Sequence, residues 1–383
     1  MDHFHYIRGL FRALRARKFQ YQRLVEVTVS REAILHNLHT FEDLYGKGVA
    51  PVLKSNAYGH GLVETAKILR GERVPFLCVD SFFEALVLRN ERITTPILII
   101  GYTPLENLKK RPLKEVSFAV ISLDELERLA SSGLRVAIHL EVDTGMHRHG
   151  IMLNELDRAL ALLAKNPQIA LEGIYTHLAD ADTSHSPHVA RQITQWNAAA
   201  AEARKKIPSI RYFHCAQTAG SFYSSRIDAN VIRIGIGLYG IYSGVGNISL
   251  RPALEMRTRI TSLRTIEAGE YVGYNAAFKA EQRMRIASIP VGYHEGIDRR
   301  LSNRGFVTVS GIPCGIVGRV SMNITSIDVS RVPDAAIDKE VVVVSADPKD
   351  PNSIARMAEI CGAIPYELLV HIPEGLRRTI KDA

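Results

Sequence analysis

The sequence lacks the signatures that would place it in several large classes of protein. No run approaches the roughly 20 consecutive apolar residues that a membrane-spanning helix needs. No GxGxxG motif follows the first predicted strand, which argues against a dinucleotide-binding fold. Internal repeats and low-complexity segments are also missing. With 46% hydrophobic residues and ordinary Gly and Pro counts, the composition indicates a soluble globular protein.

Cysteine is scarce and scattered. The four cysteines form no CxxC pair and have no histidine at metal-ligand spacing; they are Cys78, Cys215, Cys314 and Cys361. We therefore expect reduced, mostly buried thiols in a cytosolic protein, and no metal site. The net charge of +8 is spread along the chain except at its start. Because no zinc-finger or RNP-type motif accompanies this charge, nucleic-acid binding is not expected.

Residues 1–22 form a basic extension. Its apolar residues Ile7, Leu10, Phe11 and Leu14 fall on one face of a helical pattern, and its arginines lie largely off that face. The extension lacks the uninterrupted apolar core and small-residue cleavage site of a signal peptide. Contact with a membrane surface stays an alternative, but a solvated helical extension is the favoured interpretation.

At 383 residues the chain is long enough for two domains. Within residues 23–246, short apolar runs alternate with amphipathic stretches, and this predicts parallel strands with crossover helices. Eight such units suit a closed (β/α)8 barrel at least as well as an open sheet. The predicted strands are 25–29, 49–53, 76–79, 97–100, 117–121, 136–142, 173–176 and 210–214, and predicted helices include 31–45, 62–69, 83–88, 122–132 and 153–165.

Residues 247–383 have a different sequence pattern, in which short predicted strands are separated by turns rich in Gly, Pro and Asn. The predicted strands are 255–266, 284–289, 306–309, 314–317, 325–329 and 341–345. This pattern predicts a β-rich second domain. One helix at 353–360 and a short tail are expected to follow it.

Lys54 ends an apolar run at the end of a predicted barrel strand. Side chains at that position face the active-site mouth of such a barrel. A lysine there is costly unless it is paired or used covalently. Desolvation can remove its proton, after which the amine can form an imine with an aldehyde cofactor.

The segment KSNAYGHG, residues 54–61, resembles the pyridoxal-phosphate attachment motif of alanine racemases. Further segments resemble that family in the same order: VDTGMHRHG (142–150), YTHLA (175–179), HCAQTA (214–219), RIGIGLYG (233–240), VGYNAAF (272–278), PVGY (290–293) and GRVSM (318–322). Together they extend the resemblance over roughly residues 23–383. It implies an α/β protein with a (β/α)8 barrel and a mainly β C-terminal domain. Lys54 would carry pyridoxal 5′-phosphate as a Schiff base.

The resemblance also implies a two-base racemisation, because a proton leaves one face of the amino acid and returns to the other. Lys54 would act on the D-face and Tyr274 on the L-face. His177 and Arg233 resemble the network that lowers the pKa of the tyrosine. Arg233 would also face the pyridine nitrogen and keep it unprotonated, because arginine does not give up its proton.

The remaining implied roles concern binding. The residues that resemble the phosphate site are Tyr58, Thr218, the backbone amides near Gly235 and Ile236, and Tyr239 close by. Arg148 and the backbone N–H of Met322 would bind the substrate carboxylate. Because the family lends its tyrosine across a subunit interface, we expect a head-to-tail homodimer. The implied function is supply of D-alanine to peptidoglycan in the cytoplasm.

Several residues depart from the family pattern. Glu141 stands where many of these racemases carry a lysine that reacts with CO2, and our hypothesis is that it supplies the negative group beside Arg148 directly. Asn323 stands where aspartate is usual. Val370, aligned without gaps, takes the place of the tyrosine that narrows the alanine pocket. Loss of that ring would widen the pocket, although neighbouring side chains could fill the space.

Three alternatives therefore stay open beside alanine racemisation. The first is racemisation of a larger or polar amino acid such as serine, lysine or ornithine, or broad specificity. The second is a same-fold decarboxylase, which would need a catalytic cysteine that neither Cys314 nor Cys361 matches. The third is a non-catalytic pyridoxal-phosphate-binding protein of the single-barrel kind. The Tyr274 segment and the complete second domain argue against the last two.

Overall fold

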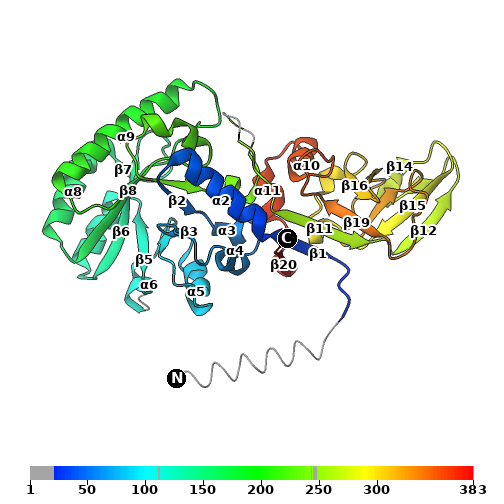
Figure 1. The fold of residues 1–383 in the computed structure, drawn as a ribbon, viewed down its shortest axis with the longest axis horizontal. Coiled ribbons are helices and arrows are strands. Elements are labelled where there is room, and N and C mark those ends of the chain that lie inside the picture. The colour runs from blue at the N-terminus through cyan, green and yellow to red at the C-terminus, as the bar shows by residue number, and fades with distance from the viewer. Residues whose placement is uncertain (1–20, 111–112, 243, 245–247, 383) are drawn as a thin grey trace, which may run out of the picture.

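A computed structural model describes residues 21–110, 113–242, 244 and 248–382. The basic extension predicted at residues 1–22 therefore lies almost wholly outside the described residues. The described chain forms two lobes, a barrel and a strand-rich lobe, and one continuous hydrophobic core runs through both (Figure 1). In the part of the chain that the structure describes, no helix has the length and apolar character needed to cross a membrane.

The first lobe is a barrel of eight parallel strands, which confirms the predicted fold class. The strands follow the order β2-β10-β9-β8-β6-β5-β4-β3, and a bridge between Val52 and Cys78 closes the ring between β2 and β3. A parallel strand such as β5 is buried along its whole length, because helices cover the outside of the barrel. The barrel strands are β2 (Gly48–Pro51), β3 (Leu77–Val79), β4 (Ile97–Ile99), β5 (Val116–Val120), β6 (Val136–Asp143), β8 (Ile169–Tyr175), β9 (Tyr212–His214) and β10 (Val231–Ile234).

Amphipathic helices follow the barrel strands, and local sequence sets where they begin. Ser122 caps α7 by accepting the N–H of Glu125, and Ser81 forms a capping box with Glu84 at the start of α5. The α-helices are α2 (Arg31–Tyr45), α3 (Lys54–Tyr58), α4 (Leu62–Ile68), α5 (Phe82–Asn90), α6 (Leu105–Lys110), α7 (Leu123–Ser131), α8 (Leu156–Lys165) and α9 (Pro187–Lys206). The 3-10 helices of this lobe are η1 (Leu153–Glu155), η2 (Ala219–Arg226) and η3 (Ile236–Tyr239), and β7 (Ile151–Met152) pairs with β6.

The second lobe consists mainly of strands, as the sequence predicts. A six-stranded sheet has the order β17 (Ile312–Gly315), β16 (Phe306–Val309), β19 (Glu340–Val344), β11 (Leu254–Arg259), β1 (Glu26–Ser30) and β20 (Arg378–Lys381). A three-stranded sheet contains β12 (Ser262–Ile266), β15 (Met284–Ile289) and β18 (Thr325–Asp328). The hairpin β13 (Tyr271–Val272) and β14 (Phe278–Lys279) encloses η4 (Tyr274–Ala276), and η5 (Tyr293–Glu295) and η6 (Arg299–Leu301) follow β15.

One strand predicted for the barrel lies in the other lobe. Residues 25–29 correspond to β1, which pairs antiparallel with β11 and parallel with β20. The eighth barrel strand is instead β10, which pairs with β2 and β9. Apolar alternation in β1 predicts a strand but does not identify its partners, so its assignment to the barrel was wrong. The domain boundaries after residues 22 and 246 stay predictions.

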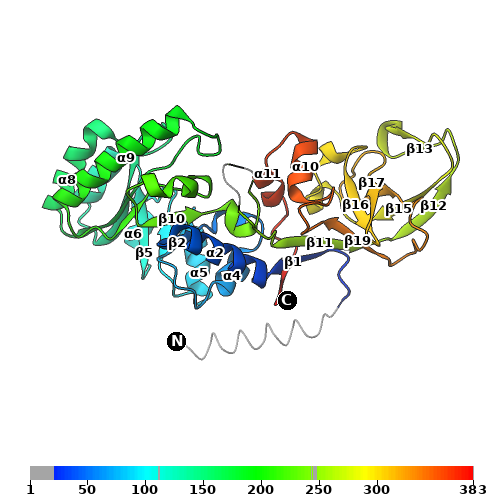
Figure 2. The same cartoon turned by 45° about the horizontal axis from the view of Figure 1, so that its top comes forward.

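The C-terminal segment has more structure than the single helix and short tail that the sequence suggested. The predicted helix is α10 (Ile354–Cys361), and a second helix, α11 (Pro365–Val370), follows before β20. Pro365 occupies the first turn of α11, where its missing N–H costs nothing. Figure 2 shows α10 and α11 at the junction between the two lobes. The second helix therefore lies where it can contribute to a site between them.

Candidate active site

Lys54 follows β2 at the mouth of the barrel and begins an unusual turn. Residues 55–57 have φ between 52 and 55°, and Tyr58 has φ 53°, so α3 is a left-handed turn. L-residues pay roughly 1–2 kcal/mol each in this conformation. The turn is held by neighbouring groups: Glu84 accepts the N–H of Ser55 at 2.7 Å, and Asn56 accepts the N–H of Leu62 at 2.9 Å. These bonds fix the backbone that carries Lys54.

Lys54 opens into a cavity of about 690 Å3, which we call the Lys54 cavity. The lysine side chain is 37% exposed, and its Nζ lies 3.8 Å from Asp80 Oδ1. The cavity brings together residues from seven barrel strands or the loops after them, and from α11. Of the residues predicted for the site, those lining it are Lys54, Tyr58, Arg148, His177, Thr218, Arg233, Gly235 and Ile236.

Arg233 lies on β10 and is buried beneath the cavity. Its Nη1 contacts His214 Nδ1 at 2.5 Å, and its Nη2 donates to the carbonyl of Thr176 at 2.8 Å and contacts His177 Nδ1 at 3.4 Å. Arginine can only donate, so His214 Nδ1 must be the unprotonated nitrogen. Burial, reinforced by the charge of Arg233, lowers the pKa of His177 to about 3 and the pKa of His214 well below its ordinary value. Nη1 also donates to the carbonyl of His214 at 3.0 Å, so the arginine is held by two carbonyls and by neutral rings.

A third histidine, His139, continues this network into the barrel core. His139 Nδ1 lies 2.7 Å from His214 Nε2, and burial lowers the pKa of His139 to about 3. Because His214 Nδ1 accepts from Arg233, its Nε2 carries the proton and donates to His139. Gly173 makes room for this ring, since a Cβ there would lie 2.4 Å from His139 Nδ1.

Glu141 places a buried carboxyl group in the same cavity. Tyr175 Oη donates to Glu141 Oε2 at 3.0 Å, and the Tyr175 ring stacks on His214 with 4.9 Å between centroids. Burial raises the pKa of Glu141, and the charges of Arg233 and Arg148 partly oppose that shift. Among the described residues, the hydrogen bond to Glu141 thus comes from Tyr175, whereas Arg148 acts on it only through space.

Tyr239 lies behind the cavity wall. Its ring is buried, 5.1 Å from that of Tyr58 between centroids, and its hydroxyl donates to the carbonyl of Val52 at 2.8 Å. In this chain the Tyr239 hydroxyl therefore anchors the end of strand β2. It is close to the predicted phosphate residues but does not line the Lys54 cavity.

Comparison with known proteins agrees with this architecture. The family model "Alanine racemase, N-terminal domain" matches residues 29–243, and "Alanine racemase, C-terminal domain" matches residues 253–380. The chain belongs to the alanine racemase family. A Sorangium cellulosum alanine racemase is 34% identical over 367 residues, covering 91% of this chain and 96% of that protein. Alanine racemase 1 of Caldanaerobacter subterraneus is 33% identical over 371 residues, covering 94% and 96%.

Solved structures of alanine racemases share the fold. The Clostridium difficile 630 alanine racemase superposes with a TM-score of 0.87 at 27% identity, covering 95% of this chain and 97% of that one. The Bacillus anthracis alanine racemase with bound L-Ala-P gives a TM-score of 0.85 at 28% identity, covering 95% and 96%. Both lobes and their arrangement are thus those of alanine racemases.

Besides Tyr239, two other residues predicted for the site, Tyr274 and Met322, do not line the Lys54 cavity. Tyr274 lies in η4 of the second lobe with 68% of its side chain exposed, and Met322 is 56% exposed. The neighbouring side chains Tyr271, Tyr293 and Ile324 are also exposed. An exposed apolar group of this kind is typical of an interaction surface. Within one chain, Tyr274 and Met322 therefore lie outside the Lys54 cavity.

Helix α11 supplies cavity residues that the sequence argument missed. Tyr366 and Glu367 line the Lys54 cavity together with Val370, which the sequence resemblance predicted for the pocket wall. The ring of Tyr366 lies 5.7 Å from that of Tyr58 between centroids. Pro365 followed by an acidic residue in the first turn was a helix-start signal, but a six-residue helix is too short for apolar periodicity to be detected.

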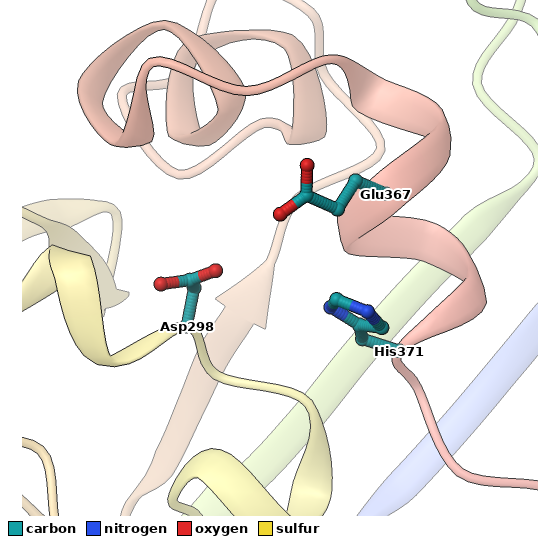
Figure 3. Close-up of side chains that lie close together, drawn as sticks. All are labelled: Asp298, Glu367 and His371. Atoms are coloured by element: carbon teal, nitrogen blue, oxygen red, sulfur yellow. The ribbon is translucent and has the colours of Figure 1, made fainter.

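A polar cluster holds α11 against the second lobe. Figure 3 shows Asp298, Glu367 and His371 pointing toward one another. Their ligand atoms lie within 4.8 Å of one another, a spacing that could hold a metal ion. However, Arg300 donates to Asp298 Oδ2 at 2.6 Å and pairs with Glu367 as well. Because the guanidinium of Arg300 already pairs with both carboxylates, we interpret the cluster as an ion-pair clasp between η6 and α11.

Proposed function

We propose that this protein interconverts L- and D-alanine with pyridoxal 5′-phosphate held at Lys54, and that Tyr274 of a second copy completes each site. The observation that carries the proposal is the Lys54 cavity, where the lysine shares a wall with a buried arginine that is bound by neutral groups. The family membership and the two-lobed fold support the same activity.

The residues around the cavity fit this cofactor. Lys54 offers the amine that an aldehyde requires. The hydroxyls of Tyr58 and Thr218 and the amides at the start of η3 supply uncharged donors for a phosphate group. A Cβ at Gly235 would lie 2.5 Å from Tyr58 Oη, so a larger residue there would displace that hydroxyl. When bound, the cofactor supplies the electron sink that makes the substrate α-proton acidic.

Arg233 would set the electronic character of that sink. As a permanent donor it would hold the pyridine nitrogen without protonating it, which weakens electron withdrawal and suppresses transamination. Its neighbours cannot reverse this, because His177 and His214 are neutral over the physiological range. Arg148 lies at the exposed side of the cavity, where it would bind the substrate carboxylate.

The two proton transfers need bases on opposite faces of the substrate. Lys54 provides one amine from the barrel side. The phenol of Tyr274 would approach from a second copy, and a phenol needs positive charge nearby to act as a base. Of the two residues predicted to supply that charge, Arg233 would do so, because His177 is neutral. The exposed position of Tyr274 and Met322 on the second lobe supports a head-to-tail homodimer.

A chiral assay tests the activity directly. Holoenzyme is incubated with each L-amino acid, and the products are separated by chiral chromatography. We expect D-alanine to form, and Lys54→Ala to abolish its formation. Exchange of the α-proton with D2O without racemisation would instead contradict the two-base mechanism.

Subunit complementation tests the shared site. Lys54→Ala and Tyr274→Phe should each lose nearly all activity. In a randomly reassembled mixture about half the dimers are mixed, and each mixed dimer has one intact site, so about a quarter of wild-type activity should return. A mixture that stays inactive would show that both residues act within one chain.

Val370 favours a second candidate, racemisation of an amino acid larger than alanine. Its side chain is half exposed and lines the Lys54 cavity. An apolar pocket distinguishes two substrates that differ by one methylene by only about 1–3 kcal/mol. In the same substrate panel, serine, lysine or ornithine turned over as fast as alanine would identify this broader activity.

The setting of the reaction follows from the same proposal. We place the protein in the cytoplasm and its product in D-alanine supply for peptidoglycan. Four buried cysteines without a disulfide support a reducing compartment. The peptidoglycan assignment rests on the family resemblance.

A further inference from the structure

A cavity of about 450 Å3 lies at the end of the barrel opposite Lys54, and we call it the base cavity. Its described lining includes residues at the starts of parallel strands, such as Ile97 of β4, Val116 of β5 and Tyr212 of β9. Lys54 instead follows the end of β2, so the packed core of the barrel separates the two cavities. The base cavity has the volume of a typical small-molecule site.

Apolar and aromatic side chains form much of the wall of the base cavity. Phe76, Leu98 and Phe118 line it and are buried. The Phe76 ring stands edge-on to the Tyr212 ring, with 5.2 Å between centroids. The charged residues in its described lining are held in ion pairs or exposed to solvent: Lys109 pairs with Glu106, Arg211 pairs with Glu172, and Glu115 and Arg135 are exposed. The described lining therefore favours an uncharged occupant.

His139 presents an unpaired hydrogen-bond donor to this cavity. Its Nδ1 accepts from His214 Nε2 at 2.7 Å, and burial lowers the pKa of His139 to about 3, so the ring is neutral and its proton lies on Nε2. Among the described residues, Nε2 has no hydrogen-bond partner, yet it is not sealed from solvent as His60 Nε2 is. His139 is 1% exposed and lines the base cavity, so this small exposed surface includes Nε2. A group of the size of water in the cavity can therefore touch that nitrogen.

From this geometry we infer that the base cavity binds a flat, uncharged molecule that accepts a hydrogen bond from His139 Nε2 and packs its apolar rings on Phe76 and Phe118. A buried donor without an acceptor is costly, and the cavity is far larger than the space that one water molecule needs. Aromatic walls favour ring systems, because stacked and edge-on ring pairs stabilise a complex beyond the area that they bury. A bicyclic heteroaromatic compound suits both the size of the cavity and its donor.

The donor is connected to the Lys54 cavity through two hydrogen bonds. His214 Nε2 donates to His139 Nδ1, and Arg233 Nη1 donates to His214 Nδ1 at 2.5 Å. Arg233 lines the Lys54 cavity. Hydrogen bonds in such a chain polarise one another, so an acceptor on His139 Nε2 should strengthen the bond from His214 and, through it, the bond from Arg233. Occupancy of the base cavity would therefore alter a group in the wall of the active site.

Binding does not depend on the proposed racemase activity, and two probes of the same shape test it. Isoquinoline has a ring nitrogen that accepts a hydrogen bond, and naphthalene has none. Each is titrated into holoenzyme by ligand-observed NMR at pH 8, where isoquinoline is uncharged. His139→Phe keeps a ring but removes the donor. We expect the ratio of the naphthalene Kd to the isoquinoline Kd to be at least tenfold higher in wild type than in His139→Phe.

Because His139→Phe also leaves His214 Nε2 without an acceptor and could impair folding, two further measurements are made. Ala137 lines the base cavity and lies two residues before His139 on β6, hence on the same side of the strand. Ala137→Leu should fill the cavity and weaken binding of both probes at least tenfold. In wild type, isoquinoline but not naphthalene should move the 1H resonance of the proton between His214 and His139 downfield. An unchanged resonance, equal selectivity in wild type and His139→Phe, or binding that Ala137→Leu does not change would overturn the inference.

Only the effect on the active site rests on the proposed function. At saturating isoquinoline the kcat for alanine should change at least twofold in wild type, whereas the same addition should leave the kcat of Ala137→Leu constant. An unchanged kcat in wild type would contradict the connection through Arg233. Selective isoquinoline binding without any racemase activity would support the cavity assignment and contradict the proposed function. Racemase activity without selective binding would do the opposite.

Discussion

At residue 141 the chain carries a buried carboxyl group within the field of two arginines. The carboxyl accepts from Tyr175, and burial raises its pKa above the ordinary range. The hypothesis that Glu141 orients Arg148 electrostatically thus requires it to be ionised at working pH. The nearby charges of Arg233 and Arg148 act in that direction.

Replacing Glu141 by Gln should raise the KM for alanine about tenfold with a smaller effect on kcat. Gln keeps the acceptor for Tyr175 but removes the charge that aligns Arg148 with the substrate carboxylate. Steady-state kinetics in both directions measure the change. Glu172→Gln is the matched control, because Glu172 pairs with Arg211 and lines a different cavity. Unchanged kinetics in Glu141→Gln would disprove the hypothesis.

For individual residues, the sequence predicted where Lys54 lies in the fold. It did not predict the hydrogen bonds that hold the turn after Lys54. The motif around Lys54 placed it at the end of a barrel strand, where it is found. The left-handed turn that follows could not be predicted, because Ser and Ala rarely adopt φ near +55° and Asn does so mostly as a single residue, not in a run. That conformation depends on Glu84, which comes from a separate helix.

Among the secondary-structure elements, α11 depends on a glycine in another part of the chain. Gly59 has φ +82°, and an added Cβ would lie 2.1 Å from the carbonyl oxygen of Leu369. Gly46, at the end of α2, has φ +67° and nothing within 4 Å of an added Cβ. The two glycines therefore separate the cost of backbone conformation from the cost of a steric clash.

Gly59→Ala should lower the free energy of unfolding by more than about 3 kcal/mol, and Gly46→Ala by about 1 kcal/mol. The larger loss includes displacement of α11, so Gly59→Ala should also weaken cofactor binding. Urea denaturation gives the stabilities, and cofactor titration gives the affinity. Equal losses in the two variants would mean that α11 moves aside without cost.

For β1 and α11, contacts between distant residues decide features that the local sequence pattern does not predict. Apolar alternation in β1 and the periodicity of α2 predicted both elements correctly as a strand and a helix. The sheet to which β1 belongs is set by contacts with β11 and β20, which local pattern does not encode. Helix α11 is held by the clasp at Arg300, another contact between distant residues.

Over the whole molecule, three buried histidines and the partly buried His177 link stability to pH. Burial lowers the pKa of His60 to about 4, of His139 and His177 to about 3, and of His214 well below its ordinary value. In the unfolded chain each would titrate near 6.5. Below that pH the unfolded state takes up protons that the folded state refuses, so stability present above pH 6.5 is lost as pH falls toward 4.

We expect the free energy of unfolding to fall by about 1.4 kcal/mol per pH unit for each such histidine at pH 6 and below. Guanidinium denaturation of the holoenzyme between pH 8 and 5 gives the slope. His139→Asn should reduce the slope by about one proton, and His185→Asn, at an exposed position, should leave it unchanged. A slope of less than one proton in wild type would contradict the neutral state of these rings.

The pairing of β1 has a consequence for synthesis on the ribosome. This strand emerges before the barrel, yet its first partner, β11, begins at residue 254 and its second, β20, at residue 378. The barrel can close while β1 still has two open edges, because none of the eight barrel strands pairs with it. An unpaired apolar strand on a nascent chain is exposed to premature association. Translation must therefore proceed to the end of the second lobe before the first strand made is protected.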